Sequence, residues 1–95
     1  MAHYYEKYEI RNSTLPLAYA KVQVYSLSLE ALSAYKRTRF YEPSHDKDIE
    51  TPGGAVLSVD ATNGKVYVSA PGNHAMLLMH AKIFERNLLE LCTFL

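Results

Sequence analysis

Residues 58–80, SVDATNGKVYVSAPGNHAMLLMH, predict two short strands joined by a tight turn, then a bend and the start of a helix. Asn63-Gly64 is a preferred pair for a type I′ turn, in which both central residues need a positive φ. We therefore expect a hairpin of residues 55–61 and 65–70. The pairs that a two-residue loop would place on one apolar face are Ala61–Val66, Val59–Val68 and Leu57–Ala70.

A helix over residues 74–94 follows the bend, with Asn73 as its N-cap. Its apolar residues recur at steps of three and four, which is typical of one buried helical face. Further apolar residues beside this stripe widen the arc to more than half of the circumference, more than one sheet face covers. We therefore expect a homo-oligomer, with these residues in its interface: Met76, Met79, Ile83 and Leu95.

The first half of the chain allows two interpretations. In the first, a strand over residues 4–10 precedes a strand near 20–25, and Ser26 or Ser28 caps a helix over residues 29–40. In the second, one helix runs from about residue 14 to 40 with a heptad stripe. The β-branched run KVQVY and the two serines favour the first.

These elements predict one α+β domain of residues 1–95, an antiparallel sheet of about four strands packed against two helices. The expected order is β-β-α-β-β-α. The alternative order is β-α-β-β-α, with the long first helix.

Composition limits the classes of function. Ten basic residues balance ten acidic ones, so nucleic acid is not an expected partner. No apolar run is long enough to span a membrane, and the first residues lack the apolar core of a signal peptide. The single cysteine, Cys92, excludes an internal disulfide and a cysteine-based zinc cluster. We expect a cytoplasmic protein.

The stretch YKRTRFY, residues 35–41, is the main candidate for ligand binding. Lys36, Arg37 and Arg39 could hold the phosphate of a nucleotide, and Tyr35 or Tyr41 could stack on its base. Cations at this position also complement the dipole of a helix C-terminus, which is the structural alternative.

The bend before the last helix is a second candidate for anion binding. The backbone at Gly72, Asn73 and His74 could hold a phosphate, because a helix start presents free N–H groups. The segment lacks the glycine pattern and the lysine of the known phosphate loops, so an ordinary capped joint is the preferred interpretation.

The loop SHDKDIE, residues 44–50, has acidic residues without the spacing of a calcium loop, and we expect no metal or cofactor. No arrangement of nucleophile and base appears, so an enzyme is not the leading expectation. Eight tyrosines suit an interface. We expect a small non-enzymatic binding protein that self-assembles and sequesters or blocks a partner. One alternative is a protein that binds a nucleotide or another anionic small molecule, and a second is a small metal-dependent hydrolase.

Overall fold

The computed structural model describes residues 5–11, 21–46, 56–70 and 74–92. The elements in chain order are β1 (Tyr5–Arg11), β2 (Lys21–Leu27), α1 (Leu29–Lys36), the 3-10 turn η2 (Pro43–His45), β3 (Leu57–Asp60), β4 (Lys65–Val68) and α2 (His74–Cys92). The expected order β-β-α-β-β-α is confirmed. The alternative of one long helix is wrong, because β2 lies in the middle of that range.

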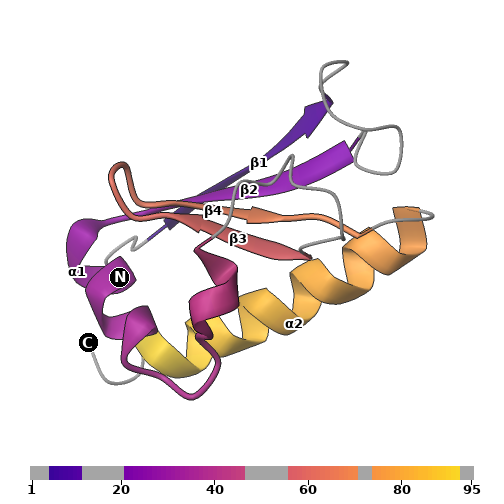
Figure 1. Cartoon of the computed structure of the whole chain (residues 1–95). Coiled ribbons are helices and arrows are strands. Elements are labelled where there is room, and N and C mark those ends of the chain that lie inside the picture. Colours follow the sequence, from indigo (N-terminus) through magenta and orange to yellow (C-terminus); the bar gives the residue numbers. More distant parts are fainter. Residues whose placement is uncertain (1–4, 12–20, 47–55, 71–73, 93–95) are drawn as a thin grey trace.

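The four strands form one antiparallel sheet in the order β1-β2-β4-β3. Helix α2 lies along one face of this sheet, and α1 lies at the end where β2 finishes (Figure 1). Among the described elements, β1 and β3 are therefore the edge strands and β2 and β4 are the central ones.

Strand β2 is buried on both of its faces. Val22 and Val24 alternate with Tyr25 and Leu27, so the two pairs point to opposite sides of the sheet, and all four side chains are buried. A nearly continuous buried run is typical of a central strand that is covered on both sides.

Helix α1 begins where the sequence predicts and ends earlier. Ser28 is its N-cap, and its hydroxyl oxygen accepts a hydrogen bond from the backbone N–H of Ala31 at 3.1 Å. The expected continuation to Phe40 is wrong, because the helix ends at Lys36. The hydroxyl of Thr38 donates to the carbonyl oxygen of Tyr35 at 2.7 Å, a local bond that competes with further helix.

The hairpin keeps its predicted apolar face but not its predicted register. β3 pairs with β4 through Leu57–Val68 and Val59–Val66, which is a shift of two residues, and Asp60–Lys65 is the last pair before the loop. Because side chains alternate with a period of two, a shift of two residues leaves the same side chains facing the core. The predicted strand ends and the two-residue loop are wrong.

Side chains in the turn explain the wider loop of residues 61–64. Asp60 Oδ1 accepts hydrogen bonds from the backbone N–H of Thr62 at 3.0 Å and from its hydroxyl at 2.6 Å. Asn63 Oδ1 accepts from the backbone N–H of Lys65 at 3.0 Å. The bonds from Thr62 also hold the pKa of the Asp60 carboxyl below its ordinary value. Within the described loop of residues 61–64, Gly64 alone has a positive φ, +74°, so this is not a type I′ turn.

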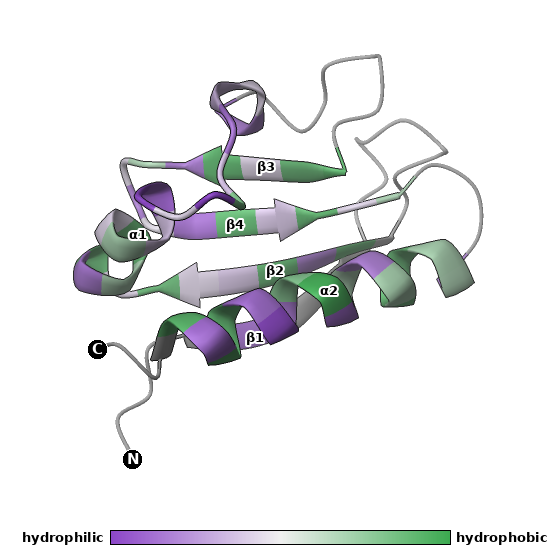
Figure 2. Ribbon diagram, turned by 90° about the horizontal axis from the view of Figure 1, so that it is seen from below, coloured by the Kyte–Doolittle hydropathy of each residue, from purple (hydrophilic) through white to green (hydrophobic). Residues whose placement is uncertain are grey.

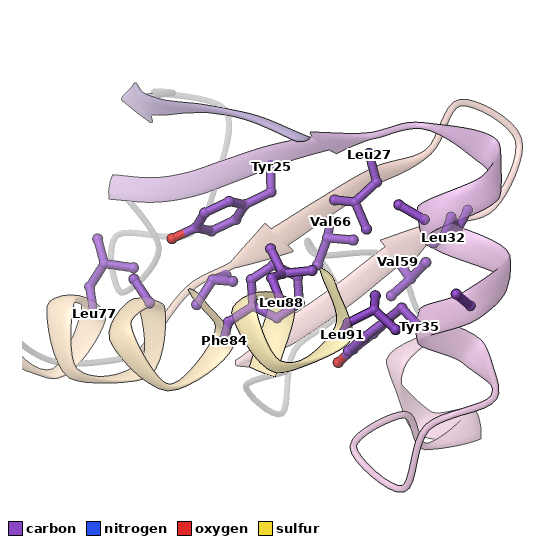
Figure 3. Close-up of a cluster of buried hydrophobic side chains, with 14 of the residues drawn as sticks. Tyr25, Leu27, Leu32, Tyr35, Val59, Val66, Leu77, Phe84, Leu88 and Leu91 are labelled. Atoms are coloured by element: carbon purple, nitrogen blue, oxygen red, sulfur yellow. The ribbon is translucent and has the colours of Figure 1, made fainter. Parts of the chain in front are cut away.

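The core lies between the sheet and the inner side of α2 (Figure 3). Phe84 is at its centre, and its ring meets the ring of Tyr25 edge-on at 4.8 Å and that of Tyr35 at 5.4 Å. Such edge-on pairs contribute beyond the area that they bury. The core residues that α2 contributes are Leu77, Ala81, Phe84, Leu88 and Leu91.

Glu85 connects α2 to the sheet. Its Oε2 atom accepts a hydrogen bond from the hydroxyl of Tyr25 at 2.8 Å and lies 3.0 Å from the ammonium nitrogen of Lys7 on β1. Tyr25 has no exposed surface, whereas the side chains of Lys7 and Glu85 are 41% and 31% exposed. The bond to Tyr25 should therefore carry more stability than the solvent-screened ion pair.

We expect Glu85→Ala to lower the free energy of unfolding by about 1.5–3 kcal/mol, because the buried Tyr25 loses a charged acceptor. Lys7→Ala is the matched control, and it should cost less than about 1 kcal/mol. Urea unfolding followed by far-UV circular dichroism measures both variants. Equal losses in the two variants would show that the bond to Tyr25 contributes no more stability than the ion pair with Lys7.

Candidate functional site

Apolar side chains are exposed on α2 next to the side of the helix that is buried. Met76, Met79 and Ile83 are 40%, 46% and 43% exposed. At about 100° per residue these three positions fall within one narrow sector of the helix. We call these three residues the methionine flank. They are three of the four residues that the sequence places in an oligomer interface, and Leu95 lies outside the described residues.

A second apolar flank lies on the other side of α2. Leu78 and Leu89 are both exposed, and the sequence analysis did not assign them to the interface. Lys82 and Arg86 project between the two flanks and divide them. Figure 2 views α2 from its outer side. The first turns of the helix are mostly green, which marks hydrophobic residues, and purple, which marks hydrophilic residues, increases toward its C-terminal end. The exposed apolar surface is therefore concentrated toward the N-terminal half of α2.

The candidate ligand-binding stretch, residues 35–41, begins in the last turn of α1. Its side chains are divided between the core and the surface. The ring of Tyr35 is 1% exposed, so it has no face free for a base. Burial, and secondarily the nearby Tyr41, raises the pKa of Tyr35 to about 12. Of the two tyrosines in the hypothesis, only Tyr41 has accessible surface.

The cations of the same stretch are accessible. Arg37 and Arg39 are exposed; Arg37 Nη1 donates to Ser33 Oγ at 2.9 Å, and the Arg39 guanidinium lies 5.1 Å from the Phe40 ring centre. The ammonium of Lys36 lies 5.4 Å from the centre of the Tyr41 ring. The structure thus brings Lys36 and Tyr41 together and leaves both guanidinium groups at the surface.

Tyr41 is also tied to η2. Its hydroxyl donates to a carboxylate oxygen of Asp46, and its ring meets that of His45 edge-on at 5.8 Å. Desolvation and this hydrogen bond raise the pKa of Tyr41 to about 12. Burial lowers the pKa of His45, against the opposing effect of Glu42 and Asp46. This cluster holds the turn together, and the bond to Asp46 was not anticipated from the sequence.

One half of the predicted anion site, the bend before α2, lies mostly outside the described residues. Gly72 and Asn73 lie outside the described residues, and His74 begins α2 with an exposed side chain. A site made by both halves, within one subunit or across a subunit boundary, stays a prediction.

Within the described residues no group of three histidine, cysteine, aspartate or glutamate side chains is placed to hold a metal ion. Residues 47–50 of the SHDKDIE loop lie outside the described ranges, so the metal-dependent hydrolase stays a prediction. Neither described helix is both long enough and apolar enough to cross a membrane. No protein-family model matches the chain, and no curated protein or solved structure is significantly similar to it.

Proposed function

We propose that this chain is a small non-enzymatic binding protein that self-associates through the methionine flank and acts by covering a surface of a partner. The observation that carries the proposal is the exposure of Met76, Met79 and Ile83 beside the buried side of the same helix. Clustered exposed apolar side chains mark interaction sites on small proteins. Methionine side chains suit such a surface, because they adapt to partners of different shape.

A symmetric pair is the simplest assembly that this flank supports. In a two-fold dimer the same surface of each subunit faces itself, so one apolar flank is enough to form both halves. A stable interface buries about 800 Å² on each partner, which is more than three side chains provide. The interface therefore extends beyond these three side chains, with the exposed Arg86 at its rim.

Charge supports a partner that is recognised by shape and apolar contact. Ten basic and ten acidic residues leave no net charge to steer a strongly charged partner over a distance. The single cysteine is consistent with a reducing compartment, and we propose the cytoplasm.

The double variant Met79→Glu/Ile83→Glu should abolish self-association and leave the fold intact, because both side chains are already exposed. In light scattering at micromolar concentrations we expect a dimer or larger species for the natural chain. For the variant we expect a mass near 10.8 kDa and an unchanged circular dichroism spectrum. Burying four like charges, two per subunit, against one another is the physical reason.

Leu89→Glu is the matched control, because it adds a charge to the same helix on the opposite flank. It should leave the mass of the natural assembly unchanged. A natural chain that stays at 10.8 kDa up to millimolar concentration would reject the proposal, as would a control that dissociates the assembly as fully as the double variant.

Binding of an anionic ligand such as a nucleotide is the second candidate, supported by the exposure of Arg37 and Arg39 beside the Lys36–Tyr41 pair. Arg37→Ala and Arg39→Ala should each weaken ATP binding by about 1.5–3 kcal/mol, the range for a charged hydrogen bond. Isothermal titration calorimetry measures this, with Arg86→Ala on α2 as the control. If the natural chain binds ATP and both variants bind it equally well, the site is elsewhere.

A further inference from the structure

A small pocket opens between the middle of α2, the start of β3 and the turn after α1. Leu57 and Phe40 form its outer walls, Phe84 and Tyr35 its inner wall, and His80 and Asn87 line it from α2. These segments are far apart in sequence, so the pocket exists only in the folded chain. His80 and Asn87 belong to no site predicted from the sequence, because no motif links them to the other residues of the pocket.

The volume of the pocket, about 140 Å³, limits what it can hold. Sites for drug-sized ligands usually occupy about 300–1,000 Å³, so a nucleotide is too large. An apolar cavity of about 150 Å³ accepts a single benzene ring. The pocket therefore matches one six-membered ring or a hydrocarbon group of similar size.

The lining is without lysine, arginine, aspartate or glutamate. An anion or a cation would lose its hydration there without gaining a charged partner, which is costly. This excludes phosphates, carboxylates and amines and leaves uncharged compounds.

Polar groups on the lining indicate that the ligand also carries a group that forms hydrogen bonds. His80 and Asn87 are seven residues apart and so lie on the same side of α2, two turns from each other. Neither side chain makes a hydrogen bond to another described residue, and both are partly exposed. The Tyr35 hydroxyl makes only a long bond of 3.5 Å, to the carbonyl oxygen of Phe40. An imidazole, an amide and a phenol can each donate and accept, as a hydroxyl group can.

From these observations we propose that the pocket binds an uncharged single-ring compound that carries a hydroxyl group, with phenol as its simplest member. The ring fills the space between Leu57, Phe40 and Phe84, and the hydroxyl bonds to the side-chain amide of Asn87. An apolar pocket with a few convergent polar groups is the usual form of a small-molecule site. The proposal does not rest on self-association.

The test is a titration of the full-length, nitrogen-15-labelled chain with phenol, followed by backbone amide shifts in NMR spectra. We expect saturable shifts centred on Leu57, Ile83 and Asn87, with a dissociation constant of about 1 mM, well within the ligand-efficiency limit for so small a compound. Benzoate, a ring of the same size with a charge, should produce no saturable shifts at these amides.

Two variants make the result specific. Asn87→Ala should weaken phenol binding about fivefold, the loss of one neutral hydrogen bond, and should not change the affinity for benzene. Leu57→Phe should fill the pocket and abolish binding of both compounds; if this variant does not fold, Asn87→Ala alone decides the role of the hydroxyl. Phenol shifts that rise linearly without saturation, or a phenol affinity that Asn87→Ala leaves unchanged, would overturn the proposal.

Discussion

Gly64→Ala should be strongly destabilising although Gly64 lies in a turn, because this glycine is buried, and it should lower the free energy of unfolding by about 3 kcal/mol or more. Gly64 has a φ of +74°, which costs an alanine about 1–2 kcal/mol. A Cβ atom there would also lie 2.4 Å from the carbonyl oxygen of Leu27, a backbone atom of the central strand. Relieving that clash would break the 2.8 Å bond from the Leu27 N–H to the Gly64 carbonyl.

Gly64→Asn separates the two causes. Asparagine tolerates a positive φ better than alanine does, so it would restore most of the stability if the dihedral angle alone were responsible. We expect Gly64→Asn to be nearly as unstable as Gly64→Ala, because both side chains carry a Cβ atom. Thr62→Ala in the same loop is the control, and it should cost at most about 1 kcal/mol in urea unfolding. A stable Gly64→Asn chain would show that β2 and the loop are not in close contact.

Phe84→Ala should lower the free energy of unfolding by about 3–5 kcal/mol, the range for removing a buried aromatic ring. Phe84 is in edge-on contact with both Tyr25 and Tyr35, so the substitution removes two aromatic contacts and leaves a cavity next to the pocket. Chemical unfolding at several temperatures measures the loss. Leu89→Ala on the same helix is the control.

Leu89 is 66% exposed, and its truncation should change stability by less than about 0.5 kcal/mol. A loss below 1.5 kcal/mol for Phe84→Ala, about half of the lower limit of that range, would mean that α2 does not dock on the sheet through this residue.

The sequence predicted those parts of the fold that depend on periodicity. The spacing from Leu77 to Leu91 identified the buried side of α2, and alternation in the hairpin identified its inner face. The register failed because two side chains, Asp60 and Asn63, bond to the backbone and widen the loop. Propensity for a type I′ turn does not account for such local bonds, and a shift of two residues leaves the apolar pattern unchanged.

The candidate sites were predictable only where exposure follows from helical geometry. Met76, Met79 and Ile83 lie off the buried stripe, and the structure places them at the surface. Tyr35 could not be placed in this way, because its direction depends on where α1 meets Phe84. The pocket was not predictable either, because it also depends on how α1 packs. Phe40 reaches α2 because α1 ends at Lys36.

Two copies of the chain should meet through the methionine flank. The most direct test of this contact is an isotope-filtered nuclear Overhauser experiment on an equal mixture of carbon-13-labelled and unlabelled chains. We predict intermolecular signals to the methyl groups of Met76, Met79 and Ile83, which are the exposed apolar groups of one flank. Intermolecular signals confined to other surfaces, or none at concentrations where the chain is assembled, would contradict the account.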